Sequence, residues 1–108
     1  MNAKQDHPDK HPLAELDRLI HAPARLMVLT YLYVVESADY IFLMQLTGLT
    51  WGNISTHLSK LEDAGYVKIE KKFIEKKSHS MVHLTPKGRQ AFMEYKTSMQ
   101  QVLGELPD

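Results

Sequence analysis

The chain contains no cysteine among its 108 residues. It can therefore form no disulfide, no thiolate metal site and no thiol redox switch. No apolar run reaches the ~18 residues that a membrane span needs. The first residues, MNAKQDHPDKHP, are polar and lack the hydrophobic segment of a secretory signal. We therefore expect a cytoplasmic protein without a membrane partner.

Signatures of catalysis and metal binding are also missing. The sequence has no glycine-rich phosphate loop, no H-E-x-x-H and no nucleophile elbow. Among the histidines, His7 and His11 lie in a segment interrupted by prolines, which disfavours an ordered helix. His79 and His83 share a predicted strand face, but zinc needs three or four converging ligands and no third is near in sequence. We expect no enzyme activity, no cofactor and no metal site.

Net charge is zero, so the chain as a whole is not a strongly basic nucleic-acid binder. The basic residues are nevertheless concentrated in one stretch. Residues 66–80 hold five lysines against two glutamates, a charge of +3, which leaves −3 for the rest of the chain. Such a patch can contact phosphate, although a solvated lysine-rich hairpin would look the same in sequence.

Most of the chain is expected to be helical, because its apolar residues recur three and four positions apart. After a loose arm over residues 1–12, the pattern predicts helices at 13–20, 23–36, 42–48, 51–64 and 86–106. The helix over 23–36 is apolar around most of its circumference and should be the central buried element. The length allows one domain, which we place at residues 13–106.

Other segments predict turns and strands. Gly48 and Gly65 suit the left-handed positions that end helices, and Thr50 suits an N-cap. Tyr40 and Ile41 could form a very short strand. From Tyr66 the apolar period changes to two, and a second alternating run covers 80–85, which predicts a hairpin. Its tip has no Asn-Gly or Asp-Gly, so a longer mobile loop is expected at 75–79.

The predicted helix over 51–64 has two contrasting faces. Trp51, Ile54, Leu58 and Leu61 form an apolar stripe that should pack in the core. The far face carries small polar residues, many of them poor helix formers, which could be an ordinary solvated surface. A helix pressed into a DNA major groove also needs short hydrogen-bonding side chains there. Gly52 would then let the first turn approach a phosphate.

The order of predicted elements narrows the fold. Two helices joined by LTGLTWG are a helix-turn-helix candidate, and a basic hairpin follows immediately. The residues LTGLTWGNISTHLSKLEDAGYVKIEKK, followed by HLTPKGR, resemble winged helix-turn-helix transcriptional regulators of the MarR and ArsR type. They are most similar to a small single-domain bacterial and archaeal group. This resemblance implies an α+β fold, mostly helical, with a hairpin wing and a C-terminal helix.

The resemblance also implies a homodimer that binds double-stranded DNA and acts as a transcriptional regulator, which we expect to repress. The helix over 51–64 would lie in the major groove, with the hairpin over 66–85 as the wing. The predicted DNA contacts on the helix are Gly52, Asn53, Ser55, Thr56, Ser59 and Lys60. Those on the wing are Lys72, Lys76, Lys77 and His79, where relatives often carry arginines. The alternative is a winged helix that serves only to bind other proteins.

A heptad-like seam on the last helix suggests where the dimer forms. The predicted interface comprises Leu13, Leu16, Ile20, Phe92, Tyr95, Met99, Val102 and Leu106. The same seam could instead close the core of one protomer. His57, at the flank of the apolar stripe, is expected to be a packed, hydrogen-bonded histidine rather than a DNA contact. No effector is identifiable, and one would have to bind at the dimer interface beside Tyr31 and Tyr33.

Overall fold

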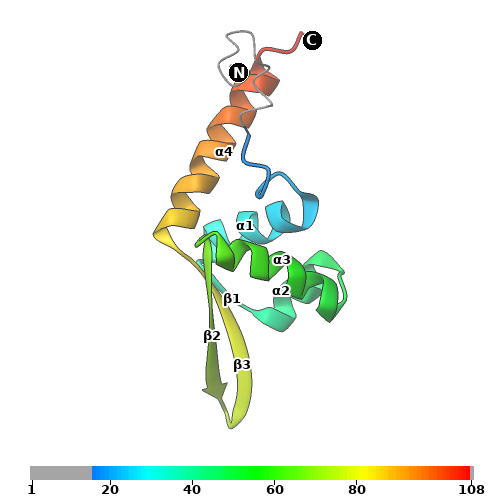
Figure 1. Cartoon of the computed structure of the whole chain (residues 1–108), viewed down its shortest axis with the longest axis vertical. Coiled ribbons are helices and arrows are strands. Elements are labelled where there is room, and N and C mark those ends of the chain that lie inside the picture. Colours follow the sequence, from blue (N-terminus) through cyan, green and yellow to red (C-terminus); the bar gives the residue numbers. More distant parts are fainter. Residues whose placement is uncertain (1–15, 108) are drawn as a thin grey trace, which may run out of the picture.

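The chain folds as a winged helix-turn-helix in a computed structural model that describes residues 16–107 (Figure 1). The predicted arm over 1–12 and Leu13 lie outside the described residues. The elements are α1 (Pro23–Val35), β1 (Ser37–Asp39), α2 (Tyr40–Thr47), α3 (Trp51–Asp63), β2 (Val67–Ile74), β3 (Lys77–Leu84) and α4 (Pro86–Gly104). The predicted α+β architecture, with a hairpin wing and a C-terminal helix, is confirmed.

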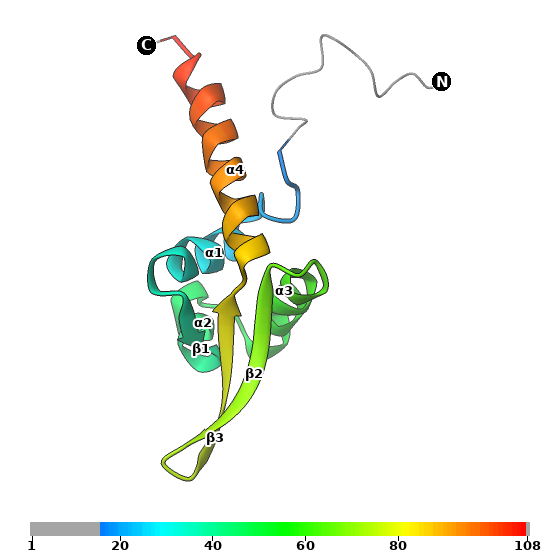
Figure 2. The ribbon, with the colours of Figure 1, turned by 90° about the vertical axis from the view of Figure 1, so that its left-hand side faces the viewer.

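The three strands form one antiparallel sheet in the order β1-β3-β2. The whole of β2 pairs with β3, from Val67 opposite Leu84 to Ile74 opposite Lys77. The short β1 covers only the base of β3, where Ser37 pairs with His83 and Asp39 with Met81. The outer half of the hairpin is therefore a two-stranded ribbon. It projects beyond the helices at the end of the molecule opposite α4 (Figures 1 and 2).

One hydrophobic core joins the helices to the inner face of the sheet. Its fully buried side chains come from α1, α2, α3, β3 and the segment before α1: Ile20, Val28, Leu29, Leu32, Leu43, Ile54, Leu58, Leu61 and Val82. The predicted stripe of α3 is thus confirmed for Ile54, Leu58 and Leu61. α1 does contact every other helix, but its apolar circumference is only partly covered, since Val34 is 77% exposed.

The segment before α1 is a turn rather than the predicted helix over 13–20, as far as residues 16–22 describe it. The side chain of Asp17 explains this difference. Its Oδ1 accepts hydrogen bonds from the backbone amides of Leu19 and Ile20, at 2.9 and 3.3 Å. Its Oδ2 accepts the hydroxyl proton of Tyr66 at 2.5 Å. Local side-chain acceptors of this kind compete with helix formation.

The short strand also lies elsewhere than predicted. It comprises Ser37–Asp39, whereas Tyr40 and Ile41 open α2. Asp39 sets this boundary, because its side chain caps the helix by accepting a hydrogen bond from the Ile41 amide at 2.7 Å. Gly48 ends α2 in the left-handed conformation, as predicted, with φ of 72°.

The wing tip is a tight two-residue turn and not the long mobile loop predicted over 75–79. Glu75 and Lys76 connect β2 directly to β3 and both have positive φ, 51° and 68°. Two consecutive left-handed residues are the hallmark of the type I′ turn, which Asn-Gly adopts most readily. Here the paired strands impose that conformation on Glu75 and Lys76, so the sequence carries no Asn-Gly signal for this turn.

The junction between the wing and α4 is unusually close. Thr85 caps α4 by accepting from the Gly88 amide at 2.9 Å, and its hydroxyl donates to the Gly65 carbonyl at 2.6 Å. A Cβ built at Gly88 would lie 2.1 Å from the Tyr66 carbonyl oxygen. Only glycine allows this approach, so α4 is held against the segment that links α3 to β2.

In the part of the chain that is described, no helix is long and apolar enough to span a membrane.

Candidate nucleic-acid interface

The outer face of α3 presents short polar side chains to solvent. Asn53, Thr56, Ser59 and Lys60 are all exposed, as is Gly52. The predicted cap is confirmed, because the Thr50 hydroxyl accepts a hydrogen bond from the Asn53 amide at 3.2 Å. Nothing lies within 4 Å of a Cβ built at Gly52. The internal packing therefore does not require glycine at this position.

Ser55 differs from the other residues predicted on this face. It is half-buried, and its hydroxyl lies 2.6 Å from the hydroxyl of Tyr40, a buried residue at the start of α2. Either hydroxyl can donate, and the pair links the two helices of the helix-turn-helix. Ser55 therefore holds α3 against α2, and sequence reasoning missed Tyr40 as its partner.

Trp51 does not lie in the core, which corrects the prediction from its helical angle. Its side chain is 53% exposed and stacks on Tyr40, with ring centroids 4.4 Å apart. As the first residue of α3 it lies at the end of the stripe, where Tyr40 already covers the core. The exposed indole therefore borders the polar face of α3, with an N–H that can donate a hydrogen bond.

His57 is packed and hydrogen-bonded, as expected. The guanidinium of Arg25 donates from Nη1 to His57 Nδ1 at 2.9 Å and from Nε to the Leu19 carbonyl at 2.5 Å. Burial, with the positive charges of Arg25 and Lys60, lowers the pKa of His57 below its ordinary 6.5. The neutral imidazole accepts a hydrogen bond from Arg25 at Nδ1 and carries its own N–H at Nε2.

The wing presents its lysines to solvent around the tight turn. Lys72, Lys76 and Lys77 are exposed, as predicted for groups that could meet phosphate. Lys71 is exposed as well and was not singled out from the sequence. His79 is more constrained, because its Nδ1 donates to Asp39 Oδ2 at 2.6 Å. Burial raises the pKa of Asp39, but hydrogen bonds from His79 and the Ile41 amide outweigh this and leave it below 3.8.

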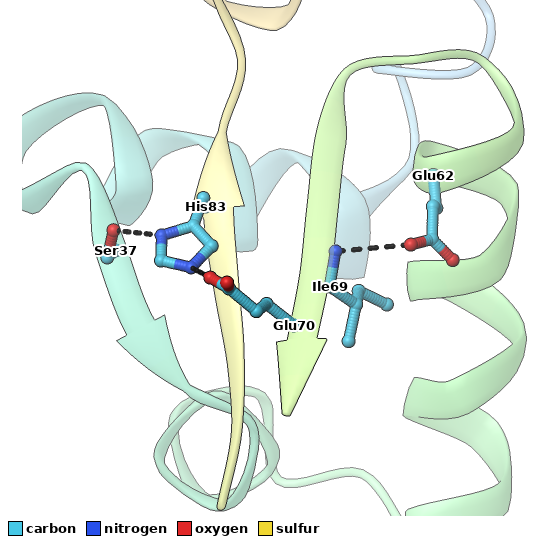
Figure 3. Close-up of polar contacts among 5 residues, drawn as sticks. All are labelled: Ser37, Glu62, Ile69, Glu70 and His83. Carbon is cyan, nitrogen blue, oxygen red and sulfur yellow. Dashed lines mark hydrogen bonds and ion pairs between the residues drawn. The ribbon is translucent and has the colours of Figure 1, made fainter. Parts of the chain in front are cut away.

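Three hydrogen bonds hold the base of the wing (Figure 3). His83 Nε2 donates to Glu70 Oε1 at 3.0 Å while its Nδ1 accepts from the Ser37 hydroxyl at 2.6 Å, so one histidine ties β3 to both of its neighbours. On the other side, Glu62 of α3 accepts from the Ile69 amide of β2 at 3.1 Å. The two histidines of β3 are thus paired with separate acids. Within residues 16–107, no three potential ligands converge on a metal position.

The structure changes the predicted dimer interface. Leu16, Ile20, Phe92 and Tyr95 belong to the protomer's own core, each at most 8% exposed, and offer almost no surface to a partner. The first part of the seam, Phe92 and Tyr95, therefore closes the core of one protomer, which was the alternative interpretation. Beyond it, Met99 and Val102 are half-buried and Leu106 is 61% exposed.

Tyr31 and Tyr33, suggested beside an effector site, do not pack on each other. The ring of Tyr31 packs on Phe42 of α2 at 4.9 Å between centroids. Tyr33 packs instead on Phe92 of α4 at 5.3 Å, and Arg89 lies 4.5 Å from its ring centroid. The two tyrosines therefore serve different contacts of α1, one with α2 and one with α4.

Comparisons with known proteins agree with this geometry. A sequence model of the family described as "Winged helix DNA-binding domain" matches residues 24–103. The uncharacterized protein MJ0432 of Methanocaldococcus jannaschii is 33% identical over 78 residues, which are 72% of this chain and 85% of that protein. A transcriptional regulator homologue from Pyrococcus horikoshii OT3 superposes with a TM-score of 0.81 at 25% identity. That match covers 88% of this chain and 98% of the other.

More distant structures share the fold. Overoxidized AbfR bound to DNA has a TM-score of 0.68 at 18% identity, covering 82% of this chain and 66% of AbfR. The ArsR family regulator RHA00566 has a TM-score of 0.58 at 16% identity, covering 89% and 94%. Three observations indicate the same fold: the hairpin beside α3, the capped α3 itself and the family match over residues 24–103. The chain therefore belongs to the winged helix DNA-binding domain family.

Proposed function

We propose that the protein is a sequence-specific transcriptional regulator that binds double-stranded DNA as a homodimer. α3 enters the major groove and the β2–β3 hairpin is the wing. The observation that carries this proposal is the exposed polar strip on α3, formed by Asn53, Thr56 and Ser59 next to a hairpin rich in lysine. Short side chains let the helix axis approach base edges, and the lysines add affinity through phosphate.

Each part of this surface has a distinct role. Asn53 and Thr56 read base edges, since amide and hydroxyl groups can both donate and accept hydrogen bonds. Lys60, Lys76 and Lys77 contact phosphate and contribute the same free energy on every sequence. The first turn of α3 approaches the backbone at Gly52, where nothing crowds the missing side chain. Ser55 holds α3 against α2 through its contact with Tyr40.

The likeness to other regulators supports DNA as the partner. AbfR shares this fold and has been solved on DNA, and the Pyrococcus horikoshii protein is a transcriptional regulator homologue of nearly the same extent. We also propose that the protein represses transcription. A bound dimer would act by occupying promoter DNA.

The dimer is proposed to form along the outer half of α4. This half extends away from the core (Figure 2) and carries Leu103, which is 57% exposed, followed by Leu106 at 61%. With the half-buried Met99 and Val102, they extend the apolar seam beyond what the protomer covers. Two such helices related by a two-fold axis bury the same patch on each other.

A salt series on duplex DNA tests the function. A pool of randomised duplexes is selected with the wild-type protein, and the recovered operator is compared with random duplex. Replacing both Lys76 and Lys77 by Ala should weaken binding to either DNA and lower the slope of log K against log salt by up to about two per wing. Lys96→Ala, which removes an exposed lysine of α4, is the control and should leave both values unchanged.

Variants of α3 test specificity separately. Asn53→Ala or Thr56→Ala should cost about 1–3 kcal/mol on the selected operator and much less on random duplex. If both variants keep the operator preference, α3 is not the reading element. If wild-type protein binds no duplex in a salt-dependent way, the protein is an interaction module and not a DNA-binding regulator.

The dimer has its own test in solution mass. Leu103→Glu places a charge on the exposed seam without touching the core and should give a monomer at micromolar concentration. Gln101→Glu, on the opposite face of the same helix, is the matched control and should leave the mass unchanged. A wild-type mass equal to one chain at that concentration would contradict the dimer.

A further inference from the structure

The wing carries an exposed aromatic ring that the proposed phosphate contacts do not explain. Phe73 is 82% exposed, the highest value for any large hydrophobic side chain among the described residues. Across the ribbon it pairs with Ser78, which is too small to cover the ring. Its neighbour Ile74 is 44% exposed. An apolar side chain this open to water gains free energy wherever a partner covers it.

Strand alternation places the ring on a defined side of the ribbon. Phe73 shares a sheet face with Val67 and Ile69, because successive side chains of a strand alternate. That face packs on the helices near the body, where Val67 is buried and so is Val82, the cross-strand partner of Ile69. Ile74 points to the opposite face. The ring therefore lies on the face that α3 adjoins closer to the body, beyond the point where the helices end.

The support beneath the ring is fixed. The last pair of the ladder, Ile74 with Lys77, closes directly into the two-residue turn, and the register is continuous back to Val67. Both turn residues have positive φ, which matches the twist of a two-stranded ribbon. Phe73 is therefore held two residues before Glu75, the first residue of the tight turn, and little conformational entropy would be lost on inserting it.

Charge identifies the partner. The ring is surrounded in sequence by Lys71, Lys72, Lys76 and Lys77, all exposed, with only Glu75 to oppose them. A partner for this tip must combine a dense negative charge with apolar surface that a ring can enter. Duplex DNA offers both, because its phosphates flank a stack of bases and apolar wedges can open a base step from the minor groove.

We infer that Phe73 is a minor-groove wedge. With α3 in the major groove, the wing reaches the adjacent minor groove, the lysines meet its phosphates and the ring partly unstacks one base step. Pyrimidine–purine steps unstack most readily, so the wedge would select them at a position that α3 never touches. This inference rests on the proposed function, and it gives the wing a preference of its own where arginines are absent.

Base-step fluorescence tests the wedge. 2-Aminopurine is placed in turn at each adenine of the selected operator, where loss of stacking makes it brighter. Wild-type protein should brighten one site in each half-site, outside the segment covered by α3, and Phe73→Ala should abolish that signal. The same variant should weaken operator binding by roughly tenfold, as expected for one lost aromatic contact to bases. The slope of log K against log salt should not change, because no charge is lost.

Matched variants separate the wedge from general damage to the wing. Phe73→Leu keeps an apolar wedge and should retain part of the signal, whereas Ile74→Ala removes an apolar side chain from the opposite face and should retain all of it. The inference is overturned if wild-type protein binds the operator without brightening any site, or if Phe73→Ala leaves the signal intact. It is also overturned if Phe73→Ala weakens binding to phosphatidylserine vesicles instead, which would assign the ring to a membrane surface. Absence of any salt-dependent duplex binding by the wild type would contradict the proposed function itself.

Discussion

The carboxylate of Glu62 accepts a hydrogen bond from the backbone N–H of Ile69 across the gap between α3 and β2, at 3.1 Å. Since β2 is an edge strand, this amide has no strand partner on its outer side. Glu62 thus provides a hydrogen-bond acceptor for one backbone amide at the edge of the sheet, and it links the wing to the helix proposed to read DNA. The contact is shown beside the paired His83 in Figure 3.

Removing this contact should loosen the wing relative to α3. Glu62→Ala should speed hydrogen exchange at the Ile69 amide. It should also weaken operator binding by about threefold to tenfold, because α3 and the wing would no longer be held in a fixed relative position on the DNA. Glu62→Gln keeps an acceptor oxygen and should remain close to wild type in both measurements. Equal exchange rates at Ile69 in all three proteins would contradict this role.

Gly52 should show opposite effects on stability and on binding. Gly52→Ala fills open space and raises helix propensity, so urea unfolding should show stabilisation by up to about 1 kcal/mol. On the operator the added methyl group would meet the DNA backbone and weaken binding by roughly tenfold, about 1.4 kcal/mol. If Gly52→Ala is more stable and binds equally well, the first turn of α3 does not approach the backbone.

Gly88 should tolerate no side chain. A methyl group there would overlap the carbonyl of Tyr66, which cannot move without shifting the start of β2. Gly88→Ala is therefore expected to lower the free energy of unfolding by about 2–4 kcal/mol, as in an overpacked core. Gly104→Ala, on the same helix with nothing within 4 Å, is the control and should change stability by no more than about 1 kcal/mol.

The stability of the fold should decline as pH falls below about 6.5, partly through His57. Its pKa is lowered by burial and by the charges of Arg25 and Lys60, so the unfolded chain binds this proton more readily than the folded one. The unfolding free energy therefore decreases through the window that starts at the unfolded pKa and ends at the lower folded pKa. His57→Gln cannot titrate and can still accept from Arg25, so its urea midpoint should fall less between pH 7.5 and 5. An equal fall in both proteins would assign the pH dependence to other groups.

Much of the fold was predictable because its signals are local. The capping hydroxyl of Thr50, the left-handed Gly48 and the buried stripe of Ile54, Leu58 and Leu61 each follow from a few neighbouring residues. Errors arose where a distant partner decides the structure. Trp51 has the angle of a core residue, but Tyr40, eleven positions earlier, already fills that place.

The contacts made by the predicted surface residues could be predicted less well than the fold, for the same reason. Ser55 and His79 were predicted as DNA contacts, but the sequence does not show that the fold also places the Tyr40 hydroxyl beside Ser55 and pairs His79 with Asp39 of β1. Phe92 and Tyr95 have the spacing of a coiled-coil seam, yet the first part of that seam is the protomer's own core. Periodicity shows that a face is apolar but not which surface covers it.

The joint formed by Thr85 and Gly88 has a consequence for the DNA that the proposed dimer would accept. α4 begins immediately after β3 and is held to Gly65 and Tyr66, so the helix that would join two protomers cannot swing relative to the reading helix and its wing. Such a dimer holds its two reading helices at a fixed distance and orientation. Its two half-sites must face the same side of the duplex, one helical turn of about 10 base pairs, or a multiple of it, apart. One inserted base pair would rotate a half-site by about 35° out of phase, and the protein has no hinge at this joint to follow it.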